Sequence, residues 1–221
     1  MIRKRNRIIS KFKSKHWQRT HEYGIRVPHS TAEAIELDIM NGGTLWKDDI
    51  KDKIVNVIPS LETWETDEKK LIGYQKIRCH MMFDIKLGEN FRRKARYVAG
   101  GHTTMTPASL TYSSVVARDS FWIAFLLKVL NGLAIKVCDI QNACLTADFR
   151  EKMCTITGPD FGSERVLIMV IRKVLHGLKS SEAAFMELLA ERLHEIGDLP
   201  SKADPDAWTR PCVKPDRFEY L

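Results

Sequence analysis

The stretch Leu133-Ala-Ile-Lys-Val-Cys-Asp-Ile-Gln-Asn-Ala-Cys-Leu145 begins with an alternating pattern that is typical of a β-strand. Because side chains alternate along a strand, Leu133, Ile135 and Val137 would share one face with Asp139. An ionised carboxylate at the end of a buried strand is costly unless it is paired, so a bound Mg²⁺ is one natural partner for Asp139. The alternative is an aspartate that caps the strand by accepting hydrogen bonds from nearby backbone amides. Taken alone, this stretch favours the cap.

Four other segments carry patterns that change this weighting. They are Arg93-Lys-Ala-Arg-Tyr-Val-Ala-Gly-Gly101, Tyr112-Ser-Ser-Val-Val116, Leu175-His-Gly-Leu-Lys179 and Ser201-Lys-Ala-Asp-Pro205. With Asp139–Leu145 they resemble boxes of the reverse transcriptases of copia-type LTR retrotransposons, in the family's order and at roughly its spacing. The family forms are Tyr-Lys-Ala-Arg-Leu-Val-Ala-Lys-Gly, Phe-Ser-Pro-Val-Val, Asp-Val-Lys-Asn-Ala-Phe-Leu, Leu-Tyr-Gly-Leu-Lys and Ser-Lys-Ala-Asp-Pro. The resemblance covers residues 23–221.

The resemblance implies an α+β fold, namely the fingers and part of the palm of a right-hand polymerase, over residues 71–221. A helical segment (27–70) and a basic leader (1–26), expected to be disordered, would precede this core. The implied reaction is Mg²⁺-dependent addition of deoxynucleotides to a primer on an RNA or DNA template. By resemblance, Asp139 is the catalytic residue and a ligand of the metal.

The family's second metal box, Tyr-Val-Asp-Asp, has no counterpart in the chain, which ends at Leu221. The adjacent pair Asp48-Asp49 lies in a helical pattern, so we expect it on a solvated helix face. Asp204 and Asp206 are expected in a turn after a helix. Because two-metal phosphoryl transfer needs carboxylates on two strands, we expect the 221 residues alone to bind Mg²⁺ weakly and to lack polymerase activity.

A basic hairpin is the expected contact for the triphosphate. Residues 76–87 alternate, a turn follows, and residues 91–99 return with Arg92, Lys94 and Arg96 on one face. By resemblance, Lys94 and Arg96 contact the incoming nucleotide, with lysine as a point charge and arginine as a bidentate fork. The alternative is the solvated polar face of an ordinary antiparallel hairpin.

By the same resemblance, Cys144, Gly177 and Lys179 belong to the nucleotide site. Cys144 stands where reverse transcriptases usually carry the Phe or Tyr that blocks a 2′-hydroxyl. Gly177 and Lys179 would lie at the floor that receives template and nucleotide, although Gly177 also suits a plain strand-to-helix turn. The family's Gln-Ala-Pro-Arg-Ala-Trp is Ser180-Ser-Glu-Ala-Ala-Phe185 here, which removes a polar group and a cation near the template. These departures indicate relaxed constraint or a divergent sublineage.

The net charge of +7 is concentrated near the N-terminus. Residues 1–26 contain nine Lys or Arg and one acid, Glu22. Such a segment is typically solvated and contacts polyanions, and the interleaved Phe12, Trp17 and Tyr23 would add stacking. The alternative is a tail that serves only solubility. The candidate nucleic-acid-binding residues are Arg3, Lys4, Arg5, Arg7, Lys11, Lys13, Lys15 and Arg19.

Several other classes of protein are disfavoured. No apolar run is long enough to span a bilayer, and the basic N-terminus lacks an apolar signal core, so we expect an intracellular protein without a membrane partner. The five cysteines form no Cys-x-x-Cys pair, which disfavours a zinc site. The competing hypotheses are a non-catalytic nucleic-acid-binding remnant of a transposable element and a decayed reading frame.

Local signals also predict individual helices and strands. Ser30-Thr-Ala-Glu33 reads as a capping box that opens a helix ending at Asn41. A strongly apolar helix over 120–130 would be capped by Asp119 or Ser120. The remaining expectations are a helix over 44–58, a doubly covered strand over 166–171, a helix from Lys179 to Gly197 with Phe185, Leu188, Leu189, Leu193 and Ile196 on one face, and a strand that begins near Phe218.

Overall fold

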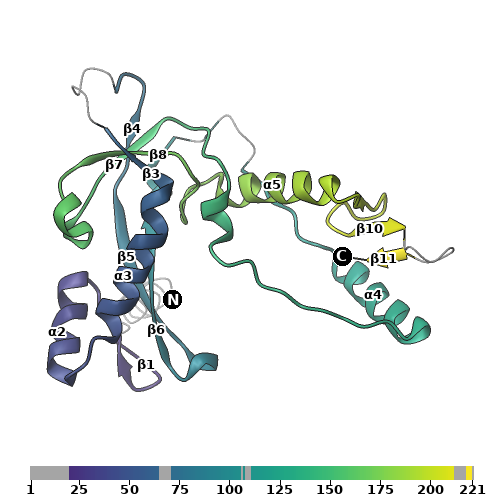
Figure 1. The fold of residues 1–221 in the computed structure, drawn as a ribbon, viewed down its shortest axis with the longest axis horizontal. Coiled ribbons are helices and arrows are strands. Elements are labelled where there is room, and N and C mark those ends of the chain that lie inside the picture. The colour runs from purple at the N-terminus through teal and green to yellow at the C-terminus, as the bar shows by residue number, and fades with distance from the viewer. Residues whose placement is uncertain (1–19, 65–70, 106, 108–110, 212–217, 221) are drawn as a thin grey trace, which may run out of the picture. The chain divides into compact units, whose positions relative to one another are not determined.

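The computed structural model describes residues 20–64, 71–105, 107, 111–211 and 218–220 (Figure 1). Helices and β-strands are both present, and the strands form four small sheets rather than one. The predicted α+β class is therefore confirmed.

The chain divides into two compact units that interleave in sequence. Unit 1 comprises residues 1–100 and 152–171, and unit 2 comprises residues 101–151 and 172–221. The expected helical segment and the basic hairpin thus belong to the same unit. Short 3-10 helices connect the main elements: η1 (Ile58–Ser60), η3 (Leu87–Glu89) and η6 (Pro159–Glu164) in unit 1, and η4 (Gly101–Thr103) and η5 (Ala143–Thr146) in unit 2.

Two capped helices open the described part of unit 1. Helix α2 spans Thr31–Asn41, and the hydroxyl of its N-cap Ser30 accepts a hydrogen bond from the Glu33 amide at 3.2 Å. The C-cap Gly42 lies in the left-handed region, where a residue without Cβ is favoured. Helix α3 spans Leu45–Val57. Both helices are confirmed as predicted. Of the capping box, the Ser30 half is formed, whereas the Glu33 carboxylate accepts a hydrogen bond from the His29 amide rather than from the Ser30 amide.

Helix α3 packs along a long antiparallel hairpin, as Figure 1 shows. The hairpin consists of β5 (Cys79–Lys86) and β6 (Arg92–Ala99), and its strands pair in register from Cys79↔Ala99 to Lys86↔Arg92. Trp46 of α3 is buried and meets Phe83 edge to face, with ring centroids 5.5 Å apart. The predicted hairpin is confirmed, and its apolar side faces α3.

The expectation that Asp48-Asp49 lies on a solvated helix face is wrong for Asp49. Its side chain is only 14% exposed, and its carboxylate accepts hydrogen bonds from the backbone amide of Ala95 and the guanidinium of Arg92. Asp49 therefore ties α3 to the backbone of β6. Asp48 is exposed as expected, and it accepts a hydrogen bond from the Thr44 hydroxyl at 2.7 Å.

A four-stranded sheet forms the rest of the core of unit 1. Its strand order is β3 (Leu61–Thr63), β8 (Ile168–Ile171), β7 (Met153–Ile156) and β4 (Gln75–Lys76), with β4 and β7 parallel and the other pairs antiparallel. The doubly covered strand that we predicted is confirmed as β8, where Met169, Val170 and Ile171 are buried. It begins two residues later than predicted, because Val166 adopts a positive φ of 64° and is exposed.

The last residues of the expected leader form an ordered hairpin. Strands β1 (His21–Glu22) and β2 (Ile25–Arg26) pair antiparallel across Tyr23 and Gly24, which both have positive φ. Asn-Gly-like turns of this kind suit the twist of a two-residue hairpin. The expectation of disorder is therefore wrong for residues 21–26, and residues 1–19 lie outside the described residues.

Unit 2 contains two longer helices and a small sheet. Helix α4 spans Arg118–Asn131 and helix α5 spans Ser181–Glu195. The sheet has the order β9 (Leu199–Pro200), β10 (Trp208–Pro211) and β11 (Phe218–Tyr220), which confirms a strand near residue 218. No helix in the described part of the chain is long and apolar enough to cross a membrane.

Helix α4 differs from the prediction in both its cap and its surroundings. Its N-cap is Ala117, and Asp119 and Ser120 lie inside the first turn. Gly132 closes it in the left-handed conformation as predicted. None of its residues is buried, and even Trp122 is 61% exposed. Its apolar side chains thus meet no core among the described residues.

The predicted strand Leu133–Asp139 is not formed. Residues 133–140 pair with none of the described strands, and Val137 is 92% exposed. Asp139 is exposed as well, so it does not end a buried apolar row. A strand requires neighbours to satisfy its backbone hydrogen-bonding groups, and alternation in the sequence alone does not supply them.

Candidate nucleotide and nucleic-acid site

A basic face on the β5–β6 hairpin carries the two candidate triphosphate ligands. Register places Arg96 opposite Met82, Lys94 opposite Asp84 and Arg92 opposite Lys86, all on one face because side chains alternate. We call Lys86, Arg92, Lys94 and Arg96 the basic face. One carboxylate interrupts it, since Asp84 lies 3.7 Å from the Arg96 guanidinium.

The cations of the basic face differ in how far they are already neutralised. Arg92 lies 3.3 Å from Glu89 and 3.4 Å from Asp49, so two carboxylates hold it at the turn. Lys86 lies 2.5 Å from the same Glu89. The candidates Lys94 and Arg96 face only Asp84 among the carboxylates of the two strands. The positive charge that is available to an anion is therefore centred on these two residues.

The electrostatic environment of Lys94 agrees with a site for an anion. Partial burial is the main cause that lowers the pKa of the Lys94 ammonium, and repulsion from Arg96 and Lys86 lowers this pKa further. An anion bound beside Lys94 would offset both effects, because it would favour the charged form of the amine.

Two of the family-like boxes meet at Gly101. A Cβ added there would overlap the Gly177 carbonyl oxygen and lie 2.9 Å from the Leu178 Cα, so only glycine fits. Gly177 itself has a φ of 90° and makes the turn before α5. The ammonium of Lys179 donates to the Thr104 carbonyl at 2.6 Å. The end of the first box thus packs directly on the Leu175–Lys179 box.

The edges of another two boxes meet at the start of α4, where Ala117 follows the Tyr112–Val116 box and Asp206 follows the Ser201–Pro205 box. One oxygen of Asp204 accepts a hydrogen bond from the Ala117 amide at 2.8 Å, and Asp206 accepts one from the Ser114 hydroxyl at 2.9 Å. The Ser120 hydroxyl and the Ala117 amide hold the pKa of Asp204 below its usual value. The turn expected for Asp204 and Asp206 therefore has a second role, which is to cap α4 from 87 residues away.

Cys144 lies in η5, which packs against α5. Its side chain is half-buried, and the sequence-based role in sugar discrimination stays a prediction. Four of the five cysteines are described, and those four form no disulfide.

The described residues do not form a magnesium site. Asp139 is exposed, and no cluster of three His, Cys, Asp or Glu side chains suited to a metal ion occurs in the part of the chain that the structure describes. Mg²⁺ takes close to octahedral oxygen coordination and releases water reluctantly, so one exposed carboxylate does not fit it. The leader candidates, Arg3 to Arg19, lie outside the described residues.

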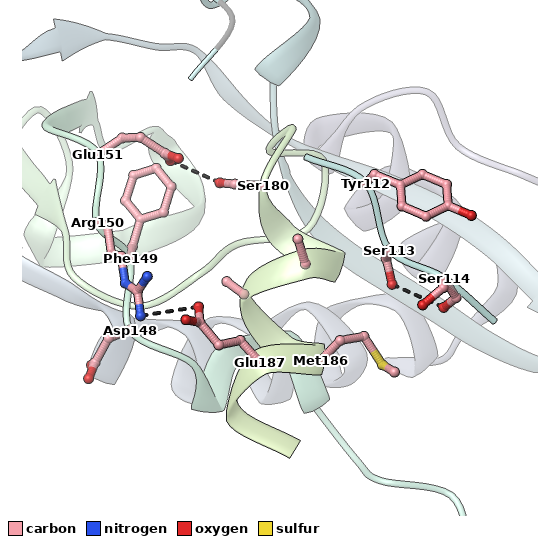
Figure 2. Close-up of a pocket in the computed structure, with 12 residues that line it drawn as sticks. Tyr112, Ser113, Ser114, Asp148, Phe149, Arg150, Glu151, Ser180, Met186 and Glu187 are labelled. Atoms are coloured by element: carbon pink, nitrogen blue, oxygen red, sulfur yellow. Dashed lines mark hydrogen bonds and ion pairs between the residues drawn. The ribbon is translucent and has the colours of Figure 1, made fainter. Parts of the chain in front are cut away.

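A pocket of about 380 Å³ was not anticipated from the sequence. Figure 2 shows it between residues 112–114, residues 148–151 and the first turns of α5. No local signal marks it, because three separate segments supply its walls. The side chains that line it include Tyr112, Phe149, Arg150, Ser180, Ala183 and Glu187.

Comparisons with known proteins identify no relative. No family model, curated protein or solved structure matches the chain.

Proposed function

We propose that this chain is the fingers and part of the palm of a copia-type reverse transcriptase, an RNA-directed DNA polymerase that extends a primer on an RNA or DNA template. In this role Lys94 and Arg96 contact the triphosphate of the incoming deoxynucleotide, and the basic residues of the leader contact the nucleic-acid backbone. Asp139 is one carboxylate of the family's two-metal centre.

The observation that carries this proposal is that family-like boxes meet in space. Gly101 ends one box and packs on Gly177 of another. At the edges of two further boxes, Asp204 accepts a hydrogen bond from Ala117, which follows the Tyr112–Val116 box, and Ser114 donates one to Asp206, which follows the Ser201–Pro205 box. Chance matches scattered along a chain have no reason to lie against one another. Contact between two boxes, and between the edges of two more, is what a common ancestral site would leave.

The chemistry that these residues support is the binding of phosphates. Lys94 is a point charge beside the planar fork of Arg96, and both project from a rigid strand, which suits a polyphosphate. We derive no polymerisation step through Mg²⁺, because Asp139 belongs to no cluster of three potential metal ligands among the described residues.

A series of charge-neutralising substitutions tests the nucleotide contact. We expect the full chain to bind a deoxynucleoside triphosphate, and Lys94→Ala and Arg96→Ala to weaken binding about tenfold each, the loss of one charge-assisted hydrogen bond. Asp84→Asn should strengthen binding, because it removes the carboxylate that competes for Arg96. Fluorescence titration with a labelled nucleotide measures all three.

Lys51→Ala is the matched control, since it removes an exposed cation from α3 of the same unit. If Lys51→Ala weakens binding as much as Lys94→Ala, the nucleotide responds to net charge alone, and the proposed contact is wrong. Equal affinity for the triphosphate and the corresponding monophosphate would also contradict it.

The parent reading frame offers an independent test. If coding sequence continues in frame beyond Leu221, we expect it to contain a Tyr-x-Asp-Asp box shortly after the strand β11. Sequencing the transcript in the 3′ direction decides this. An in-frame continuation that lacks an adjacent acidic pair would count against a polymerase.

The second candidate is a non-catalytic nucleic-acid-binding remnant, which the isolated Asp139 favours. In both cases the leader should bind nucleic acid without regard to sequence, with an affinity that falls as salt rises, because each neutralised phosphate releases counterions. A deletion of residues 1–19 tests this, since it leaves β1, β2 and the Glu22 hydrogen bond to the Ile85 amide in place. If the deletion leaves the affinity and its salt dependence unchanged in a gel-shift titration, the leader does not bind nucleic acid.

A further inference from the structure

The pocket in unit 2 is a groove across the first turns of α5, and we call it the α5 groove. Ala183 and Ala184 of α5 line it, and their small side chains leave the helix surface open. Phe149 stands on one side and Tyr112 on the other, as Figure 2 shows. A groove of about 380 Å³ between two aromatic rings has the size and the walls for one flat, ring-shaped ligand.

The charged groups of the α5 groove are already paired with one another. The Arg150 guanidinium lies 3.1 Å from the Glu187 carboxylate, and the hydroxyl of buried Ser180 donates to Glu151 at 2.9 Å. Figure 2 marks both contacts with dashed lines. Asp148, at the rim, lies 2.6 Å from Lys173. The groove therefore presents both donors and acceptors, and each of its three carboxylates already has a partner.

This pairing decides which ligand chemistry fits. An anion such as a phosphate would face Glu187, Glu151 and Asp148, and an organic cation would compete with Arg150 and Lys173 for carboxylates that these cations already hold. A neutral heterocycle that carries both donors and acceptors along its edge can hydrogen-bond to both partners of the Arg150–Glu187 pair, so that neither charge is left without a partner. One of its faces would stack on the exposed ring of Tyr112.

We propose that the α5 groove binds a single unpaired nucleobase of a single-stranded nucleic acid, and that it prefers guanine. Aromatic side chains commonly hold splayed bases by stacking, while polar groups read the edge of the base. Guanine offers O6 as an acceptor for Arg150 and two adjacent N–H donors for the carboxylate of Glu187. This site rests on the proposed function, because it presupposes a nucleic-acid ligand.

The test uses two probes with the same number of phosphates. One is a fluorescent 12-mer of abasic deoxyribose-phosphate residues, and the other carries one guanine at its centre. We expect the full wild-type chain to bind the guanine probe about fivefold or more tightly, the range seen for one stacked base. The ratio of the two affinities should not change with salt, because both probes release the same counterions.

Tyr112→Ala should bring this ratio to one without changing the affinity for the abasic probe. Tyr112 is 72% exposed, so its removal leaves the fold intact. Trp122→Ala is the matched control, because Trp122 is another exposed aromatic of unit 2 that lies outside the groove. A third probe with thymine at the centre should bind more weakly than the guanine probe.

Each other result overturns the inference in a distinct way. If the wild-type chain binds the guanine and abasic probes with equal affinity, the groove does not bind a base, and only the salt-dependent binding of the backbone remains. If Trp122→Ala but not Tyr112→Ala made the affinities for the guanine and abasic probes equal, the base would bind at α4 and not in the groove. Failure to bind any probe at low salt would overturn both this inference and the nucleic-acid binding of the proposed function.

Discussion

Helices α3 and α4 have nearly the same length, yet α3 buries four residues and α4 buries none. The buried residues of α3, Trp46, Ile50, Ile54 and Val57, form one stripe that faces β6. The apolar residues of α4 surround the helix, with Phe121, Trp122, Ile123, Phe125 and Leu126 all exposed by a third or more. A stripe needs one neighbour, whereas a helix that is apolar on all sides needs several.

The comparison teaches that the sequence period predicts where a helix can be buried, but packing depends on which segments reach it. In α3 the stripe is strengthened by a polar contact, since Asp49 binds the backbone of β6. In α4 the corresponding polar contact lies at the N-terminal end, where Asp204 caps the helix. Four experiments measure how much these contacts contribute to stability.

The two helices each carry a tryptophan, which gives the largest expected contrast. Trp46→Ala should lower the free energy of unfolding by about 3–5 kcal/mol, because it empties a buried site next to Phe83. Trp122→Ala should change it by less than about 0.5 kcal/mol, as for other exposed positions. Denaturant titration followed by far-UV circular dichroism measures both. Equal costs would show that α4 is packed and would remove the contrast.

Asp49→Ala tests whether the polar contact of α3 matters as much as its stripe. We expect a loss of about 1.5–3 kcal/mol in the free energy of unfolding, typical of hydrogen bonds to a charged group, because the Ala95 amide and Arg92 lose their acceptor. The neighbouring Asp48→Ala is the control, and it should cost a few tenths of a kcal/mol at most. If Asp48→Ala costs more stability than Asp49→Ala, Asp49 is exposed in solution.

Gly101→Ala tests whether unit 2, which contains the exposed helix α4, also contains a tightly packed contact. The added Cβ would overlap the Gly177 carbonyl, so we expect a cost of about 1–3 kcal/mol in the free energy of unfolding. Gly88→Ala is the control, because a Cβ there meets no atom within 4 Å. If Gly101→Ala is as neutral as Gly88→Ala, these two boxes do not touch.

The smallest expected effect is the pH dependence of the α4 cap. Because the pKa of Asp204 is lowered in the folded protein, its contribution to stability is complete above the unfolded pKa of about 3.9 and is lost as pH falls through the folded value. Asp204→Asn should lower Tm at pH 6, and the difference from wild type should shrink towards pH 3. A difference that grows on acidification would contradict the cap.

The sequence predicted those features whose causes lie within a few residues. Ser30 and Glu33 are close enough to mark the start of α2, and the apolar run over 166–171 identified the central strand β8. The alternation over 76–99 likewise predicted the hairpin and the face that carries Lys94.

The features that the sequence did not reveal depend on distant partners. Asp204 caps α4 from 87 residues away, and nothing near Ala117 signals this. The stretch around Val137 alternates like a strand, but no described strand pairs with it. The α5 groove combines three segments, none of which carries a binding pattern by itself. Local periodicity cannot encode which segments meet.

The strand order of the unit 1 sheet has a consequence for biosynthesis. Strand β3 is translated early, but its neighbour β8 emerges only about a hundred residues later. At the usual rate of about 5–20 residues per second, β3 waits on the order of 5–20 s on the ribosome before it can pair. During that interval β3 and the apolar surface beneath it are open to chaperones or to a second nascent chain. The α3–hairpin layer can form in the meantime, since all of its residues precede Gly101.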